Sequence, residues 1–222
     1  MSTQPYQDDM ERLERHYAGL FSREGDSPQA VQWRDRASQE RRFEILAEVC
    51  LPSDATVLDF GCGTGHLLEF LRRERQFVGE YTGYDLTAEM ITAARRKFPD
   101  ARFERRNIFT DGLDRDFDFV FISGVFNNAM TDNEKFMHDV LRLLFQHTRR
   151  AMAFNALSNY VDFFDEGLYY ASPEKMFRFC KETLSPLVTL RHDYLVKPGA
   201  VPYEFTIYVH RCDLKPRAAL QP

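Results

Sequence analysis

Apolar side chains recur with the period of a helix along the first fifty residues. Five of them share one face of a predicted helix: Met10, Leu13, Tyr17, Leu20 and Phe21. Tyr17 is interpreted as a core residue because it belongs to this stripe. Ser27 and Pro28 are typical of a helix start, and a second stripe at positions 43, 46, 47 and 50 ends before Pro52. Residues 1–50 are therefore expected to form a helical cap, or lid, on another part of the molecule.

From residue 55 the pattern changes to short apolar runs that alternate with helical segments. Strands are predicted at residues 56–60, 80–84, 102–107, 117–123 and 151–155. Helices are predicted at 66–71 and 88–98, after a capping box at 131–134, and from Ser172 to about residue 181. Two extended runs, 187–195 and 203–210, close the chain as a hairpin. We predict an α/β fold over residues 51–212, followed by a tail at 213–222. Its seven-stranded sheet is expected to be mostly parallel, with one antiparallel strand from the hairpin.

Composition and charge narrow the class of partner. The 222 residues include 29 Lys and Arg against 34 Asp and Glu, a formal charge of −5, and 44% are apolar. Such a chain lacks the basic face that phosphate backbones require, so nucleic acid is not expected as a partner. No apolar run approaches the roughly 18 residues of a membrane span, and the polar first ten residues do not resemble a signal peptide. We expect a cytoplasmic protein with no membrane partner.

The cysteines give no sign of a metal site or a disulfide framework. The four lie far apart in the sequence and form no C-x-x-C pair: Cys50, Cys62, Cys180 and Cys212. Free thiols and no bound metal are expected.

The glycine-rich stretch after the first predicted strand carries the candidate chemistry. Gly61, Gly63 and Gly65 leave main-chain N–H groups unshielded and let a ligand lie against the turn. Asp85 follows Gly65 by 20 residues, at the predicted end of the second strand, where a carboxylate can bind a ribose diol. The alternative is a plain tight turn with a helix-capping acid. The strand context on both sides and the spacing of the acid favour an adenosine-containing ligand.

The segment from Val57 to Gly65 resembles the first motif of class I S-adenosylmethionine-dependent methyltransferases, a strand that ends D-x-G-x-G-x-G. Residues 82–86, 106–108 and 117–126 resemble the next three motifs, and the resemblance covers about residues 38–210. It implies a Rossmann-like fold, S-adenosylmethionine as the cofactor and S-adenosylhomocysteine as the product. NAD is disfavoured, because its pyrophosphate is typically bound by the spacing G-x-G-x-x-G.

The resemblance also implies which residues bind the cofactor. The glycines would pack against its methionine part, Asp85 would hold the ribose, Asn107 and the Ile108 backbone the adenine, and Ser123 the amino-acid end. The full expected set is Asp59, Gly61, Cys62, Gly63, Gly65, Asp85, Leu86, Asn107, Ile108 and Ser123. His66, at the start of the first sheet-domain helix, is expected near the cofactor rather than in catalysis.

Methyl transfer by in-line displacement needs an aligned nucleophile and a dry site, and it needs a base only if the acceptor carries a proton. The candidate catalytic residues are His192, Asn155 and Tyr169, although His192 is alternatively a packed or exposed strand histidine. The candidate substrate-binding residues are Trp33, Arg42, Asn127, Asn128, Tyr160, Tyr170, Tyr203 and Glu204. Trp33, Gln39 and Arg42 are expected beside the cofactor mouth. The long loop 156–171 is expected to be a substrate lid.

These features predict transfer of a methyl group to an O or N nucleophile of a small molecule. The choice of a small acceptor depends on the lack of a basic stripe or an added RNA-binding module in the sequence. An RNA or protein methyltransferase, and a cofactor-binding protein without catalytic activity, are the alternatives.

Overall fold

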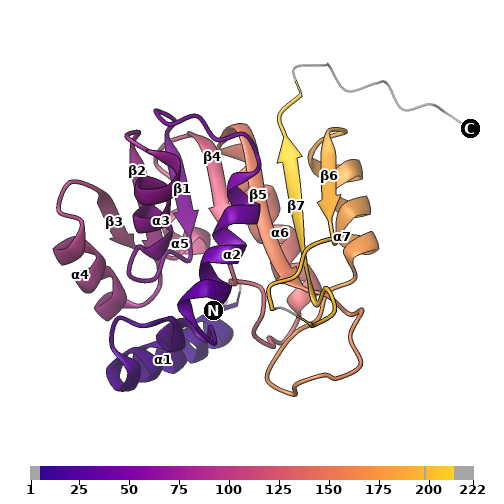
Figure 1. Ribbon diagram of the computed structural model, residues 1–222, viewed down its shortest axis with the longest axis horizontal. Coiled ribbons are helices and arrows are strands. Elements are labelled where there is room, and N and C mark those ends of the chain that lie inside the picture. Colours follow the sequence, from indigo (N-terminus) through magenta and orange to yellow (C-terminus); the bar gives the residue numbers. More distant parts are fainter. Residues whose placement is uncertain (1–5, 198, 213–222) are drawn as a thin grey trace, which may run out of the picture.

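Seven strands form one sheet in the order β3-β2-β1-β4-β5-β7-β6 (Figure 1). The structure is a computed structural model that describes residues 6–197 and 199–212, so the predicted tail at 213–222 lies outside the described residues. The strands are β1 Val57–Phe60, β2 Tyr81–Asp85, β3 Arg102–Arg105, β4 Phe117–Ile122, β5 Thr148–Leu157, β6 Val188–Arg191 and β7 Glu204–His210. Strand β7 is antiparallel to both of its neighbours, β5 and β6, whereas β3, β2, β1, β4 and β5 pair in parallel. The predicted fold class is confirmed.

Helices cover both faces of this sheet. They are α1 Gln7–Glu24, α2 Arg36–Ala47, α3 His66–Arg75, α4 Ala88–Lys97, α5 Ile108–Asp111, α6 Asn133–Gln146 and α7 Pro173–Phe179. A 3₁₀ turn, η1 Pro28–Val31, precedes α2, and a π-helical turn, η2 Cys180–Leu184, extends α7. Local chemistry explains two of the starts: the side chain of Asp35 accepts a hydrogen bond from Ser38 N at α2, and that of Ser172 accepts one from Lys175 N at α7.

The alternation of side chains along β4 shows how the two faces are filled. Val120 and Ile122 pack with α6 and α7 in one apolar cluster, whereas Phe119 and Phe121 pack with α2, α3 and α4 in another. Burial of both faces explains why β4, in the middle of the sheet, is mainly an apolar run without regular polar alternation. The sheet is thereby fixed as a rigid platform, and its carboxyl ends carry the loops described below.

Several predicted boundaries shift for local reasons. The third strand stops at Arg105, because the side chain of Asn107 accepts a hydrogen bond from Phe109 N and starts α5. The capping box with Thr131 as the N-cap was wrong: Asp132 caps α6 by accepting from Lys135 N. Strand β5 is longer than predicted at both ends, whereas the extended run 187–195 keeps only the four residues of β6.

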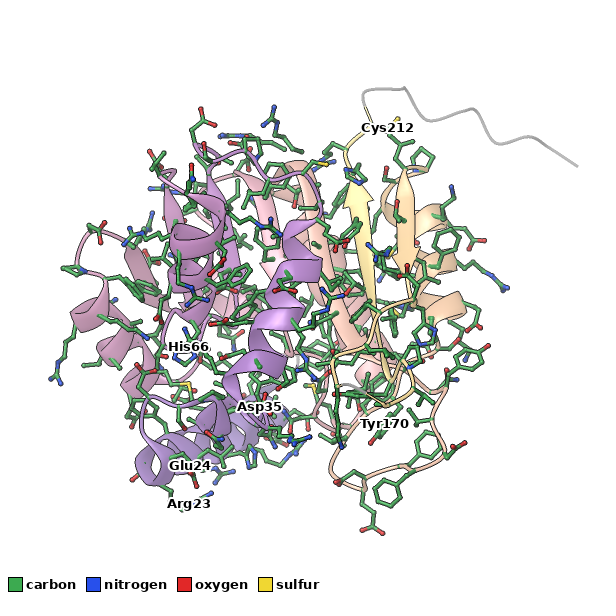
Figure 2. The ribbon with its side chains drawn as sticks, in the orientation of Figure 1. Arg23, Glu24, Asp35, His66, Tyr170 and Cys212 are labelled. Atoms are coloured by element: carbon green, nitrogen blue, oxygen red, sulfur yellow. The ribbon has the colours of Figure 1, made fainter. Side chains whose placement is uncertain are left out.

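The predicted cap consists of two differently placed helices. Helix α1 lies across the carboxyl ends of the parallel strands, whereas α2 lies on a sheet face beside α3 (Figure 1). Polar contacts hold α1 there, since Arg12 donates to the carbonyl of Ala129 at 2.8 Å and Thr131 N donates to Asp9 at 3.1 Å. Figure 2 shows Tyr170 at this same end of the sheet and Cys212 at the opposite end.

Two further expectations concern the whole chain. All four cysteines lie in the described part, and each is a free thiol. No helix among residues 6–197 and 199–212 is long and apolar enough to cross a membrane.

Candidate active site

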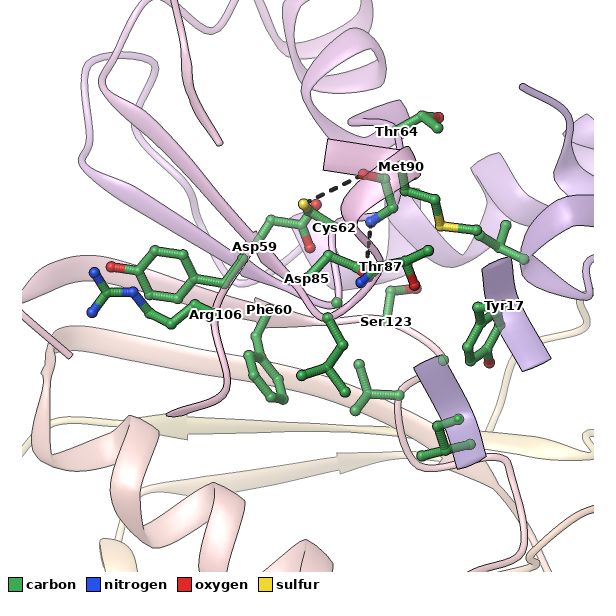
Figure 3. Close-up of a pocket in the computed structure, with 18 of the residues that line it drawn as sticks. Tyr17, Asp59, Phe60, Cys62, Thr64, Asp85, Thr87, Met90, Arg106 and Ser123 are labelled. Carbon is green, nitrogen blue, oxygen red and sulfur yellow. Dashed lines mark hydrogen bonds between the residues drawn. The ribbon is translucent and has the colours of Figure 1, made fainter. Parts of the chain in front are cut away.

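A pocket opens at the carboxyl ends of β1, β2 and β4, beneath α1 (Figure 3). Nine of the ten predicted cofactor residues line it: Asp59, Gly61, Cys62, Gly63, Asp85, Leu86, Asn107, Ile108 and Ser123. Gly65 does not line the pocket and instead caps α3 behind it, with φ +82°. The sheet therefore brings together almost the whole set that the motifs indicated.

Neighbouring side chains lie so close to the glycine loop that two of its positions, Gly61 and Gly65, have little room for a Cβ atom. Gly61 has φ +79°, and a Cβ there would lie 2.4 Å from a methyl carbon of Val125. Gly65 would place a Cβ 3.0 Å from the Phe103 ring. Any side chain at either position would displace the turn between β1 and α3. The turn can therefore keep its backbone at the pocket wall only with glycine.

Asp85 links the second strand to this turn. Its Oδ2 accepts from Gly63 N at 2.9 Å and its Oδ1 accepts from Thr87 N at 2.8 Å, so both oxygens are fixed but keep further lone pairs (Figure 3). Burial raises the pKa of Asp85, and these backbone donors oppose that shift. A rigid carboxylate with free lone pairs at the end of β2 suits a ribose diol.

Asp59 supplies a second carboxyl group at the pocket, from strand β1. It is 3% exposed, and the Tyr81 hydroxyl donates to its Oδ2. Burial, with a smaller contribution from the nearby Asp85 carboxylate, raises the pKa of Asp59 to about 7, and the Tyr81 hydroxyl opposes this shift. A cationic ligand would stabilise the ionised form of Asp59, so this end of β1 is complementary to positive charge.

The polar groups of the pocket follow four neighbouring strands. Asn107, Asp85, Gly61 and Ser123 stand at the ends of β3, β2, β1 and β4, in that spatial order. Because neighbouring strands lie about 4.8 Å apart, these groups extend over roughly 14 Å. Such a row suits an elongated ligand. The Oδ1 of Asn107 also accepts from Phe109 N at 3.0 Å, so this side chain is already oriented by the start of α5.

The roof of the pocket comes from the N-terminal segment. Met10, Leu13 and Tyr17 of α1 line it, as do Val31 and Trp33. The interpretation of Tyr17 as a core residue was wrong, because the helical stripe faces the hollow as well as the core. The Tyr17 hydroxyl donates to Gln32 at 3.1 Å and accepts from Asn128 at 2.7 Å, and burial raises its pKa to about 12.

Asp26 ties this roof to the sheet domain. Its carboxylate contacts Thr64, His66 Nε2 at 2.9 Å and Lys97 Nζ at 3.1 Å. These partners, His66 first, lower the pKa of Asp26. His66 lines the pocket as expected, but its imidazole is engaged by Asp26. Asp26 thus links the segment between α1 and η1 to the start of α3 and to the end of α4.

Trp33 closes the pocket on the side of β4, and Arg42 packs against Trp33. The Arg42 guanidinium lies 3.9 Å from the Trp33 ring centroid, and the indole edge would lie 2.5 Å from a Cβ at Gly124. Arg42 also donates to both carboxylate oxygens of Glu204, to the Ser38 carbonyl at 2.7 Å and to the Tyr203 hydroxyl at 3.5 Å. Both members of the ion pair are buried, so they are bound mainly to the protein itself.

None of the three candidate catalytic residues is among those that line the pocket. The Oδ1 of Asn155 accepts from Gly124 N at 2.8 Å, and this residue is buried beside Ser123. His192 lies past the end of β6, with Nε2 at 3.0 Å from the Pro202 carbonyl and its ring near that of Tyr160. Tyr169 is half-buried, and its N–H donates to the Asn127 carbonyl at 2.8 Å.

The other candidate substrate residues surround the loop 156–171. Asn128 pairs with Leu168 in a β-bridge, and Asn127 lies two residues after the pocket residue Val125. Tyr160 is exposed and donates to Glu174, and the Tyr170 hydroxyl accepts from Asp165 N at 3.2 Å. Tyr203, like Glu204, contacts Arg42. Of the eight candidates, only Trp33 lines the pocket directly.

Comparison with known proteins agrees with this arrangement. A family model described as a methyltransferase domain matches residues 51–158. "Putative methyltransferase Rv1506c" of Mycobacterium tuberculosis is 37% identical over 162 residues, which cover 70% of this chain and 93% of that protein. The trans-aconitate 2-methyltransferase of Variovorax paradoxus is 42% identical over 67 residues, 30% of this chain but only 26% of that enzyme.

Solved structures share the fold at low sequence identity. Magnesium protoporphyrin IX methyltransferase from Synechocystis, with bound S-adenosylmethionine, has a TM-score of 0.67 at 13% identity and covers 95% of this chain and 100% of its own. The plantazolicin methyltransferase BpumL, in complex with a triazolic desmethylPZN analogue and S-adenosylhomocysteine, has a TM-score of 0.60 at 13% identity and covers 92% of this chain and 99% of its own.

The residues of the pocket also fit the group that such a domain binds. The cradle formed by the glycine loop, the fixed carboxylate of Asp85 and the buried carboxyl of Asp59 supply a diol acceptor and a site for positive charge on one continuous wall. From the family match, the relative that aligns over 93% of its own length and this fit, we conclude that the chain belongs to the class I S-adenosylmethionine-dependent methyltransferases.

Proposed function

We propose that this enzyme transfers a methyl group to an oxygen or nitrogen nucleophile of a small molecule. The observation that carries the proposal is the roof: α1 and the segment up to Trp33 cover the pocket, and Trp33 reaches Gly124 at the end of β4. An acceptor must approach the sulfur end of the cofactor through this narrow space. A compact molecule satisfies that condition more readily than a folded RNA or protein surface.

When bound, S-adenosylmethionine supplies the electrophilic methyl group for an in-line displacement. The protein contributes orientation and exclusion of water. Asp85 holds the ribose, Asp59 offers a carboxylate to positive charge, and Tyr17 and Trp33 keep solvent away. Residues 1–50 act as the lid in this proposal, although α2 is also part of a sheet-face core.

Asn155 serves as a positioning residue in this proposal. Its amide oxygen accepts from Gly124 N, and its amide nitrogen lies 3.5 Å from the Ser123 hydroxyl. It therefore fixes the backbone where the amino-acid end of the cofactor and the acceptor would meet. The geometry supports orientation of this segment more directly than contact with the acceptor.

His192 is the proposed base for an acceptor that carries a proton. With Nε2–H donating to the Pro202 carbonyl, Nδ1 is left as an acceptor for a proton. Tyr169 is proposed to orient the acceptor, because it lies where the loop 156–171 pairs with residues 127–129, which follow the pocket residues 123–125. In the same proposal, this loop is the substrate lid.

The cofactor part is tested by calorimetry with S-adenosylhomocysteine. Asp85→Ala should weaken binding by about 100-fold or more, since two hydrogen bonds to a charged group, each contributing about 1.5–3 kcal/mol, are lost. Asp114→Ala is the matched control, because Asp114 bonds to Tyr84 but does not line the pocket. Equal binding by both variants would contradict the assignment of Asp85.

The acceptor class is tested by methyl-labelled S-adenosylmethionine and separated cell fractions. Label should enter the small-molecule fraction and be lost with His192→Ala at neutral pH if the acceptor is protonated. Label in RNA or protein, accompanied by salt-sensitive RNA binding in the first case, would replace the small-molecule proposal. Binding of the cofactor without label in any fraction would favour a noncatalytic protein.

A further inference from the structure

One buried polar side chain faces the pocket without a partner. Gln39 of α2 is 3% exposed and lines the pocket, and its Oε1 has no hydrogen-bond partner. Of the five described side-chain atoms that are buried without a hydrogen-bond partner, only this one belongs to a residue of the pocket wall. Buried amides are normally bonded, so an unbonded amide at a ligand pocket points to a ligand group that completes it.

The polar neighbours of Gln39 on α2 are hydrogen-bonded within the protein, so the unbonded amide oxygen of Gln39 is an exception on this helix. Ser38 bonds to Asp35 through both its N–H and its hydroxyl, and the guanidinium of Arg42 bonds to Glu204, Ser38 and Tyr203. Phe43, four residues after Gln39 on the same helical face, lines the pocket with it. The polar side chains of Ser38 and Arg42 are therefore hydrogen-bonded to the protein, whereas that of Gln39, which lines the pocket, has an unbonded oxygen.

The position of α2 identifies which end of the ligand Gln39 faces. Arg42 on the same helix stacks on Trp33, and Trp33 contacts Gly124 after β4. The adenine side of the pocket, at Asn107, lies three strands away at the end of β3. Gln39 therefore belongs to the end of the pocket that the amino-acid part of S-adenosylmethionine occupies when its ribose is held by Asp85.

We propose that Gln39 hydrogen-bonds the α-amino acid group of the cofactor and thereby selects ligands that carry this group. An amide presents a donor at one end and an acceptor at the other, so it can serve the carboxylate or the ammonium of a zwitterion. Asp59 offers only oxygen acceptors once ionised, and the amide of Gln39 adds an N–H donor to the lining of the same pocket. The proposal rests on the binding of S-adenosylmethionine and deepens it.

The test compares two probes that share an adenosine but differ at the far end. S-adenosylhomocysteine carries the amino acid group, whereas 5′-methylthioadenosine lacks it. Calorimetry on Gln39→Met, which keeps the length of the side chain but not its polar atoms, should show about tenfold weaker binding of S-adenosylhomocysteine. The affinity for 5′-methylthioadenosine should stay within twofold of that of the original chain.

Two comparisons keep the test decisive. Gln146→Met, at the exposed end of α6, should leave both affinities unchanged. Equal weakening of both probes, or no weakening of either, would overturn the role of Gln39. If the original chain bound neither probe, the cofactor assignment itself would fail, which is a different outcome.

A measurement on the unaltered chain covers the case in which Gln39→Met does not fold. The side-chain amide resonances of Gln39, assigned by NMR, should shift on addition of S-adenosylhomocysteine and stay in place with 5′-methylthioadenosine. Equal shifts with both nucleosides would contradict the proposal.

Discussion

The edge of the sheet that carries the pocket has two regions whose polar groups differ: a ligand-facing half at β3, β2 and β1, and a bonded half at β5 and β7. At the ends of β3, β2 and β1, polar groups face a hollow and keep lone pairs free, as Asp85 does. Beside the end of β5 and the start of β7, polar side chains are bonded to one another, as Arg42 of α2 and Glu204 of β7 are. The first half is thus prepared for a fixed ligand, whereas the second is stabilised by its own contacts. The difference teaches that an unsatisfied polar group is better evidence of a binding site than a buried charge.

The largest expected effect on stability concerns the bonded half, where Arg42 pairs with Glu204. Arg42→Met leaves Glu204 buried without its partner, so it should reduce the free energy of unfolding by about 3–5 kcal/mol in urea titrations. The double variant Arg42→Met with Glu204→Leu should recover most of that loss, because neither charge then needs a partner. A loss below about 1 kcal/mol for Arg42→Met would show that the pair faces water.

A pH dependence tests the ligand-facing half. Burial raises the pKa of Asp59 to about 7, above its unfolded value near 4, so the folded state holds a proton that the unfolded state releases. Stability relative to Asp59→Asn should therefore fall as pH rises from about 4 to 7, by at most about 4 kcal/mol. Urea midpoints at pH 4, 5, 6, 7 and 8 measure it.

The matched comparison for Asp59 is Tyr81→Phe. Removal of the hydroxyl that donates to Asp59 should raise the pKa of this carboxyl further and extend the decline to higher pH. A flat difference between Asp59→Asn and the original chain would contradict the buried, protonated carboxyl.

The junction of the two halves lies at Gly124. Gly124→Ala meets both an unfavourable φ of +76° and the Trp33 ring, so it should cost about 2–3 kcal/mol of unfolding free energy. Gly112→Ala has a similar φ of +63° with open space around it, and should cost only about 1 kcal/mol. Equal losses would mean that Trp33 moves aside at no cost.

The smallest effect on stability is expected at the loop 156–171. Phe163 and Phe164 are exposed there, so the double change to Ser should alter the free energy of unfolding by no more than about 0.5 kcal/mol. The affinity for S-adenosylhomocysteine should be unchanged, while kcat/KM for the acceptor should fall if the loop is the substrate lid. Unchanged turnover would remove the loop from the site.

Sequence reasoning located the ligand-facing half because its chemistry is local. The turn from Gly61 to Gly65 and the acid Asp85 stand at fixed offsets from two apolar strands, and parallel pairing brings them together. The ion pair of the bonded half could not be predicted from the sequence, because its partners, Arg42 and Glu204, are 162 residues apart. No local pattern distinguishes a residue that binds a ligand from one that binds such a partner.

The same limit applies to the roof and to several boundaries. The stripe with Tyr17 predicts an amphipathic helix, but period alone does not say whether that face meets a core or a cavity. Asn107 and Asp132 start helices through side-chain bonds that compete with strand extension or with the neighbouring Thr131. Gln39 was expected beside the mouth of the pocket, but its lack of a partner is visible only in three dimensions.

The separation of Arg42 from Glu204 also bears on the order in which the chain folds. Helices α1 and α2 are synthesised well before the residues that hold them, which are Ala129, Thr131 and Glu204. Contacts between such distant positions form late, since a long loop must close before they stabilise the chain. We therefore expect the roof to close after the parallel strands have assembled, so that helices made before the sheet reach their places after it.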